Sequence, residues 1–136
     1  MEFNVVWMED GEIKRVVVDG ENYEYTVGTK GAWRMLIADE DKKVEKGKQY
    51  KIKVKEVIIP PDSISIPCSC MRNALGFVEA TGKFGRPGLI EEGRKIDFVV
   101  FTAIEDGEIK NGDLLGVINV FPVMITRFAK KPEIKK

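Results

Sequence analysis

Apolar and polar residues alternate with a period of two along almost the whole chain, and this pattern constrains the fold most strongly. Tyr50, Ile52 and Val54 alternate with lysines, which is typical of a strand with one buried and one solvated face. After Glu56 three apolar residues follow in a row, so we expect a bulge or a more buried setting there. No segment is long enough to form a helical crossover between parallel strands.

Turn-forming glycine pairs separate the expected strands. Asp10–Gly11 stands between two alternating runs, and Asp–Gly supplies the positive φ angles of a tight hairpin turn. Counting such runs gives about nine to eleven short strands, which predicts an all-β, mainly antiparallel fold, either a β-sandwich or a β-clip-like barrel. Residues 71–80 are the one stretch suited to a short helix, so we expect at most one.

The chain has the length of one domain. It contains 136 residues, and a domain takes roughly 100–200 residues. We expect a single β domain over residues 1–128 and a charged tail, residues 129–136, that frays. Because proline cannot donate to a strand ladder, we also expect two separate strands, residues 113–121 and 123–128, on either side of Pro122.

The charge balance and the missing histidine exclude several classes of function. The chain has 22 basic and 22 acidic residues and a formal net charge of zero, whereas proteins that bind nucleic acid usually carry a basic excess. We therefore do not expect nucleic-acid binding. The absence of histidine excludes Ser–His–Asp and Cys–His nucleophile systems and removes the commonest general base.

The composition also gives expectations about location and source. We find no basic region followed by an apolar core at the N-terminus, as a signal peptide would have. No apolar run approaches the roughly 20 residues of a membrane span, so we expect a cytoplasmic protein without a membrane partner. Gln49 is the only glutamine, which favours a thermophilic source because amides are thermolabile.

Cys68 and Cys70 are the only two cysteines. In a strand their side chains would share one face, where two thiolates can bind a soft metal. Tetrahedral zinc needs four ligands, so such a site would require a second subunit. The alternative, which we favour, is that both are small buried side chains, with reactive thiols as a further possibility.

Arg72 and Asn73 follow the cysteines directly. Arginine offers a planar fork that suits a carboxylate or phosphate, and asparagine both donates and accepts hydrogen bonds. The pair therefore fits a ligand-contact corner. An ion pair for Arg72 and a turn cap for Asn73 explain the same residues structurally, and both interpretations stay open.

Residues 82–93 form a glycine-rich loop that suits close approach to a ligand. In it, Arg86 can meet an anion, while Glu91 and Glu92 can hold a cation or act as acid and base. The favoured alternative is a flexible connector with a solvated charge pair. Asp97 lies between two apolar residues of the next expected strand, and alternation places it on the solvated face.

Residues 32–125 resemble the archaeal proteins grouped as "domain of unknown function 22". The most specific parts of the resemblance are the Pro–Cys–Arg–Ala–Leu–Gly segment within residues 67–76 and the Lys–Asn–Gly–Asp–Leu–Leu–Gly segment, residues 110–116. The resemblance implies an archaeal source and no established activity. It assigns no catalytic residue and no cofactor.

The order of residues 69–93 and 109–120 is also similar in layout to the dUTPase and dCTP deaminase group, which has a β-clip fold and trimers with sites between subunits. That resemblance implies that Arg72 touches phosphate and that Leu89, Ile90 and Glu91 stand near a sugar. Glu91 stands where that group has aspartate.

These observations predict a small ligand-binding or self-associating β domain that forms homo-oligomers. A small-molecule ligand, if there is one, would lie near Arg72, Asn73 and residues 82–93. Two alternatives remain: a nucleotide-processing enzyme that needs magnesium, and a cysteine-based metal or redox protein. The sequence leaves open whether the chain is an enzyme.

Overall fold

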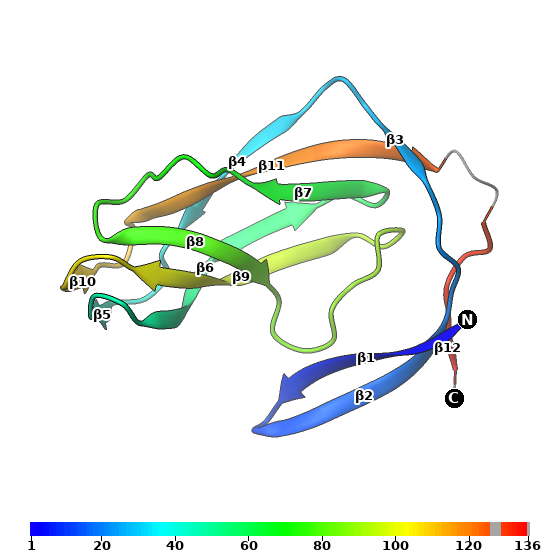
Figure 1. Ribbon diagram of the computed structural model, residues 1–136, viewed down its shortest axis with the longest axis horizontal. Helices are drawn as coiled ribbons and strands as arrows, with labels where there is room; N and C mark the ends of the chain where they lie inside the picture. Colours follow the sequence, from blue (N-terminus) through cyan, green and yellow to red (C-terminus); the bar gives the residue numbers. More distant parts are fainter. Residues whose placement is uncertain (126–128, 136) are drawn as a thin grey trace.

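The computed structural model describes residues 1–125 and 129–135, and strands make up most of them (Figure 1). Those residues contain no helix, and all of their strand pairs are antiparallel, so the all-β, antiparallel prediction is confirmed. Without a helix, the described residues also contain no helical membrane span. The strands are β1 (Glu2–Glu9), β2 (Glu12–Asp19), β3 (Tyr25–Val27), β4 (Ala32–Ile37), β5 (Lys42–Val44), β6 (Gln49–Ile59), β7 (Ser63–Pro67), β8 (Gly76–Gly82), β9 (Arg94–Ala103), β10 (Gly107–Ile109), β11 (Leu114–Ile125) and β12 (Glu133–Lys135).

Two sheets form the body of the molecule. In one, β11 pairs with β3 and β4 along one side and with β7 along the other; in the second, β9 lies between β6 and β8. The sheets lie one above the other in Figure 1 and do not close into a barrel. The barrel alternative was therefore wrong, and the two layers correspond to the sandwich alternative.

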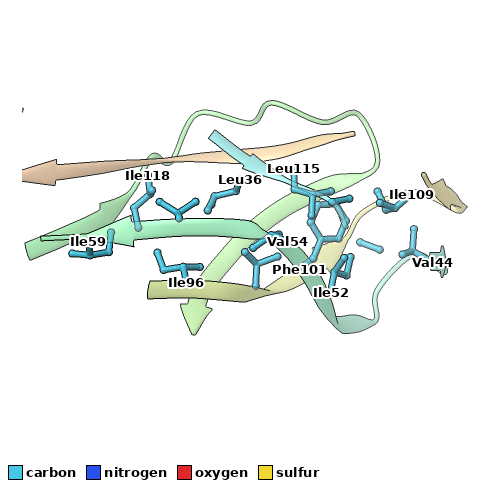
Figure 2. Close-up of a cluster of buried hydrophobic side chains, with 14 of the residues drawn as sticks. Leu36, Val44, Ile52, Val54, Ile59, Ile96, Phe101, Ile109, Leu115 and Ile118 are labelled. Atoms are coloured by element: carbon cyan, nitrogen blue, oxygen red, sulfur yellow. The ribbon is translucent and has the colours of Figure 1, made fainter. Parts of the chain in front are cut away.

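The hydrophobic core fills the space between the two layers (Figure 2). Leu36, Leu115 and Ile118 reach into it from the β11 sheet, whereas Ile52 and Phe101 come from the opposite sheet. All five side chains are fully buried. Burial of each large apolar side chain stabilises the fold by about 1.5–3 kcal/mol, so this cluster holds the two sheets together.

The bulge expected after Glu56 is confirmed. The register between β6 and β9 shifts between Lys53 and Val57. As a result Lys55 and Glu56 are both exposed, while Val54 and Val57 on either side of them are both buried. The extra residues let β6 keep its apolar side chains in the core on both sides of the shift.

Pro122 does not divide the last long strand into two. β11 runs through it without a break, pairing with β4 before the proline and with β3 after it. The Pro122 carbonyl accepts a hydrogen bond of 2.7 Å from the Gly28 N–H. The expectation of two strands was wrong because the proline lies where β11 changes partner, so its missing N–H interrupts neither ladder. Residues 126–128 of the expected strand lie outside the described residues.

Residues 71–80 hold the end of a turn and most of β8 instead of the start of a helix. Gly76 begins β8 opposite Ala103 of β9. A Cβ at Gly76 would lie 2.8 Å from the Phe101 ring and would also clash with the Thr102 carbonyl oxygen. Glycine therefore allows β8 to approach β9 closely, which fixes this segment as a strand.

The N-terminal hairpin stands apart from the two layers (Figure 1). β1 and β2 pair along their full length, and Asp10 and Gly11 have φ angles of 51° and 76°, as expected for the Asp–Gly turn. Within the charged tail, β12 pairs with β2. The expectation that this tail frays was therefore wrong for Glu133–Lys135, whereas the boundary expected at residue 128 lies outside the described residues.

An acidic residue links the tail to the hairpin. Asp19 accepts hydrogen bonds from Lys130 Nζ at 2.8 Å and from the amino terminus at 3.1 Å. The hydrogen bond from Lys130 is the largest cause that lowers the Asp19 pKa from 3.8 to about 2, followed by the bond from the amino terminus. Because the folded state favours the carboxylate, the stabilisation is complete above pH 3.8 and is lost as the pH falls through about 2.

We predict that β12 loosens from β2 as the pH falls from about 4 to about 2. The measurement is the amide chemical shift and exchange protection of Ile134 across this range. Asp19→Asn should loosen β12 at pH 5 and remove most of the further change on acidification. A wild-type Ile134 signal that stays constant down to pH 2 would contradict the prediction.

Candidate ligand-binding cleft

A cavity of about 380 Å³ lies between the hairpin and the loop that joins β8 to β9. This volume is in the range of about 300–1,000 Å³ that small-molecule sites occupy. We call it the cleft. Among the described residues its lining is Val6, Trp7, Met8, Lys51, Ile59, Ser65, Thr81, Gly82, Lys83, Phe84, Gly85, Pro87, Gly88, Arg94, Lys95, Ile96 and Phe98.

Aromatic rings form part of the cleft wall. The rings of Phe84 and Phe98 lie with their centroids 4.9 Å apart, tilted by 45°. A Cβ at Gly82 would clash with the Phe98 ring, so the glycine leaves room for that ring. Trp7 of β1 belongs to the lining from the hairpin side. The cleft therefore offers flat apolar surfaces from both the hairpin and the second sheet.

The charged residues that line the cleft are all basic: Lys51, Lys83, Arg94 and Lys95. Lys51 Nζ lies over the two phenylalanine rings, 4.2 Å from the Phe98 centroid and 5.0 Å from that of Phe84. Lys95 Nζ is 3.3 Å from Glu56, which is not among the lining residues. Although the whole chain has no net charge, this cleft is locally positive and favours an anion.

Two of the basic side chains also hold the loop in place. Lys83 Nζ donates to the carbonyl oxygens of Phe84 and Arg86, and Arg94 donates to those of Leu89 and Ser63. Partial burial lowers the pKa of Arg94, while Tyr23, Glu91 and Glu92 oppose the shift. An arginine remains charged in proteins, so burial brings a partly desolvated positive charge to the cleft.

Arg86 and Glu92 come together at the other side of the loop. Their side chains approach to 3.5 Å, and Glu92 accepts a hydrogen bond from the Leu89 N–H at 3.0 Å. Both line an adjoining cavity of about 390 Å³, which shares Lys83, Arg94 and Lys95 with the cleft. These two predicted site residues therefore lie beside the cleft, with Glu92 also stabilising the loop.

Glu91 is not among the residues that line the cleft, although its charge acts on Arg94, which is. One of its carboxylate oxygens, Oε2, is buried without a hydrogen-bond partner among the described residues. Burial raises the pKa of Tyr23, and the charge of Glu91 raises it further. Nearby, Asp97 is half-buried and accepts a hydrogen bond from the Phe84 N–H at 2.8 Å. Alternation predicted only that Asp97 lies on the solvated face. Its carboxylate also helps to hold Phe84, one of the aromatic residues of the cleft wall, in place.

Arg72 and Asn73 lie at the opposite end of β8 from the loop. Seven residues of β8 separate the two places, a distance of about 20 Å along a strand. Asn73 donates to the Leu114 carbonyl at 3.0 Å and accepts from the Leu75 N–H at 2.9 Å, which is the turn-cap arrangement. The structure therefore does not bring Arg72 and Asn73 together with Arg86 and Glu92.

Cys68 and Cys70 lie just beyond the end of β7, beside Arg72. Cys68 is half-buried and Cys70 is exposed, so the favoured expectation that both are buried was wrong. The backbone of Cys70 hydrogen-bonds to Cys68 and lowers its pKa, and Arg72 lowers it further. The described residues contain no cluster of three or more metal-binding side chains, so one chain offers two thiols here.

Sequence reasoning singled out the loop but missed the residues that make the cleft. Lys51 is at one of the alternating positions of β6 that the sequence pattern predicts to be solvated. It lines a cavity because the hairpin lies across from it, and the sequence near Lys51 does not show this. The one local signal was Phe84, a large apolar residue in a glycine-rich loop. Nothing in the sequence near Trp7 indicates that β1 faces this loop.

Comparison with known proteins identifies relatives without assigning an activity. The model of a family described as "Domain of unknown function DUF22" matches residues 2–107. The match includes the hairpin, which lies outside the resemblance seen over residues 32–125, and it ends before β11. A protein named "Uncharacterized protein MJ0614", from the archaeon Methanocaldococcus jannaschii, is 29% identical over 105 residues, covering 77% of this chain and 80% of the relative. No solved structure matches the chain.

Proposed function

This chain belongs to the DUF22 family, and we propose that it binds a small anionic molecule with a planar ring in the cleft. The observation that carries the proposal is the lining: four basic side chains, three aromatic rings and no carboxylate among the described residues. Several basic groups that line one cavity attract an anion, and aromatic surfaces stack on flat rings. A nucleoside phosphate combines both chemistries.

The cleft supports binding better than magnesium-dependent turnover of a nucleotide. Magnesium is usually held by carboxylates together with substrate phosphates, and the described lining offers only basic and neutral side chains. Arg72, which the nucleotide-enzyme alternative places on phosphate, is separated from the cleft by β8. We therefore assign the cleft a binding role and name no catalytic residue.

We also propose that the chain associates with itself in the cytoplasm. The support is the number of large apolar side chains that the fold leaves exposed on the hairpin and on the β11 sheet. Large exposed apolar patches usually mark interaction sites. The composition that favours a thermophilic source is consistent with this, because oligomers are one means of raising thermal stability.

The binding proposal is tested by isothermal titration calorimetry at low salt with nucleoside mono- and triphosphates and with inorganic phosphate. Nucleotides should bind more tightly than phosphate, because only they can stack on Phe84, Phe98 or Trp7. Lys51→Met should weaken nucleotide binding about tenfold or more, since it removes one charge-assisted contact.

Lys53→Met is the matched control for this test. Lys53 is also exposed on β6, two residues from Lys51, but does not line the cleft. Its replacement should leave binding unchanged. The proposal fails if no nucleotide binds at millimolar concentration, or if the two lysine variants bind equally well.

A further inference from the structure

β11 has the sequence of a strand that is buried on both faces. Its residues Leu114–Ile125 form a nearly continuous apolar run, whereas a strand with one solvated face alternates apolar and polar residues. Ile118 and Val120 point into the core between the two sheets. The residues of β11 between and beside them, among them Val117, Phe121 and Val123, therefore point to the opposite face, where the described residues form no other layer (Figure 1).

The strands beside β11 continue the same apolar face. Asn119 lies opposite Trp33 of β4 and Ile66 of β7, while Val117 lies opposite Met35. The remaining cross-strand partners are also apolar or aromatic. We call this surface the outer face and define it as Tyr25, Val27, Trp33, Met35, Ile64, Ile66, Val117, Asn119, Phe121, Val123 and Ile125. It contains no charged residue.

The outer face contains one buried residue, Val117, and several side chains that are half exposed. Val117 is only 1% exposed, yet it does not belong to the core cluster between the sheets. Other side chains of the outer face remain half exposed: Trp33 by 51%, Met35 by 49% and Ile66 by 50%. A solvated sheet face normally carries polar residues at such positions.

We propose that the outer face packs against the outer face of a second copy of this chain, forming a two-fold dimer. This inference rests on the proposed self-association and names the surface that carries it. A two-fold interface brings the same patch of both copies together, and an uncharged apolar face is complementary to itself without any arrangement of opposite charges. Two such sheets pack about 10 Å apart, as in a β-sandwich.

The size of the outer face suits this partner. The exposed parts of Tyr25, Val27, Trp33, Met35 and Ile66 add up to roughly 500 Å² of apolar residue surface. A standard interface buries about 800 Å² per partner, including a polar rim. Trp33 lies opposite Asn119 on the outer face, in the same row as Ile66, and tryptophan is one of the residues that most often contribute a large part of the binding energy.

The test uses two isoleucines with nearly the same exposure on different surfaces. Ile66 is 50% exposed on the outer face, and Ile13 is 51% exposed on the hairpin. Sedimentation equilibrium should show wild type and Ile13→Glu as dimers. Ile66→Glu should weaken the dimer by at least about a hundredfold, because it places a charge without a partner in an apolar interface.

The possible outcomes show separately whether the chain self-associates at all and whether it does so through the outer face. A wild-type protein that stays monomeric at 100 µM or so, well above typical dissociation constants, overturns both. A dimer that persists in Ile66→Glu overturns the outer face, and if Ile13→Glu is monomeric the hairpin is the interface instead.

A second measurement does not depend on a charged variant folding. In a Trp7→Phe variant, Trp33 is the one remaining tryptophan. Its fluorescence maximum should shift to longer wavelength when the dimer dissociates on dilution, since the indole becomes exposed to water. A maximum that does not move across the dissociation measured by sedimentation places Trp33 outside the interface and overturns the proposal.

Discussion

Phe101→Ala should lower the free energy of unfolding by about 3–5 kcal/mol. Phe101 is fully buried between the two sheets and is among the largest fully buried side chains of the described residues. Its removal forfeits the burial of an aromatic ring and leaves a cavity that two paired sheets cannot close by moving together. Urea unfolding of both proteins, followed by circular dichroism, measures the difference.

Phe84→Ala is the control for that prediction. Phe84 is exposed and packs against one side of Phe98, so its replacement should cost about 1 kcal/mol or less. Equal losses for the two variants would mean that the space between the sheets is not the core. The Phe84 variant is also informative for the cleft, because it should weaken binding of a planar ligand while leaving the fold intact.

Gly76→Ala should be almost as damaging, with a loss of about 3 kcal/mol or more. The new methyl group would clash with the Thr102 carbonyl and would lie 2.8 Å from the Phe101 ring. The carbonyl belongs to β9, the central strand of its sheet, and cannot move without separating β8 from β9. Replacing Phe101 by leucine in addition should not restore stability, since the backbone clash remains.

Gly93→Ala is the matched control for the glycine prediction. A Cβ at Gly93 would meet no atom closer than 3.7 Å, where Pro61 makes an ordinary van der Waals contact. This variant should unfold within about 0.5 kcal/mol of wild type. If Gly76→Ala is equally harmless, β8 does not approach β9 as closely as described.

The fold was predictable where local chemistry decides the conformation. The Asp10–Gly11 turn and the bulge after Glu56 both follow from a few neighbouring residues. Pro122 misled the prediction because its effect depends on which strand lies beside it. Two partners, β4 and β3, meet at that point of β11, and no local pattern shows where one strand ends and another begins.

The site was less predictable because it is assembled by distant segments. The loop could be identified from its glycines, and it brings Arg86 and Glu92 together as a pair. The positions of Lys51 and Trp7 depend on where the hairpin lies relative to the second sheet, which sequence alternation does not encode. Arg72 and Asn73 looked close to the loop in the sequence, but β8 is an extended strand and carries them away from it.

The pairing of β11 has a consequence for how the chain folds. β11 is the shared partner of β3, β4 and β7, and Val120 pairs with Ala32, far back in the chain. The entropy of closing such a loop is lost before the contacts that reward it form, so folding should take milliseconds to seconds, as in other domains with distant strand pairings. Until β11 arrives, β4 and β7 have open edges in a chain that is not yet folded. The risk of aggregation during folding is therefore set by the rate at which β11 docks, and final stability has little influence on it.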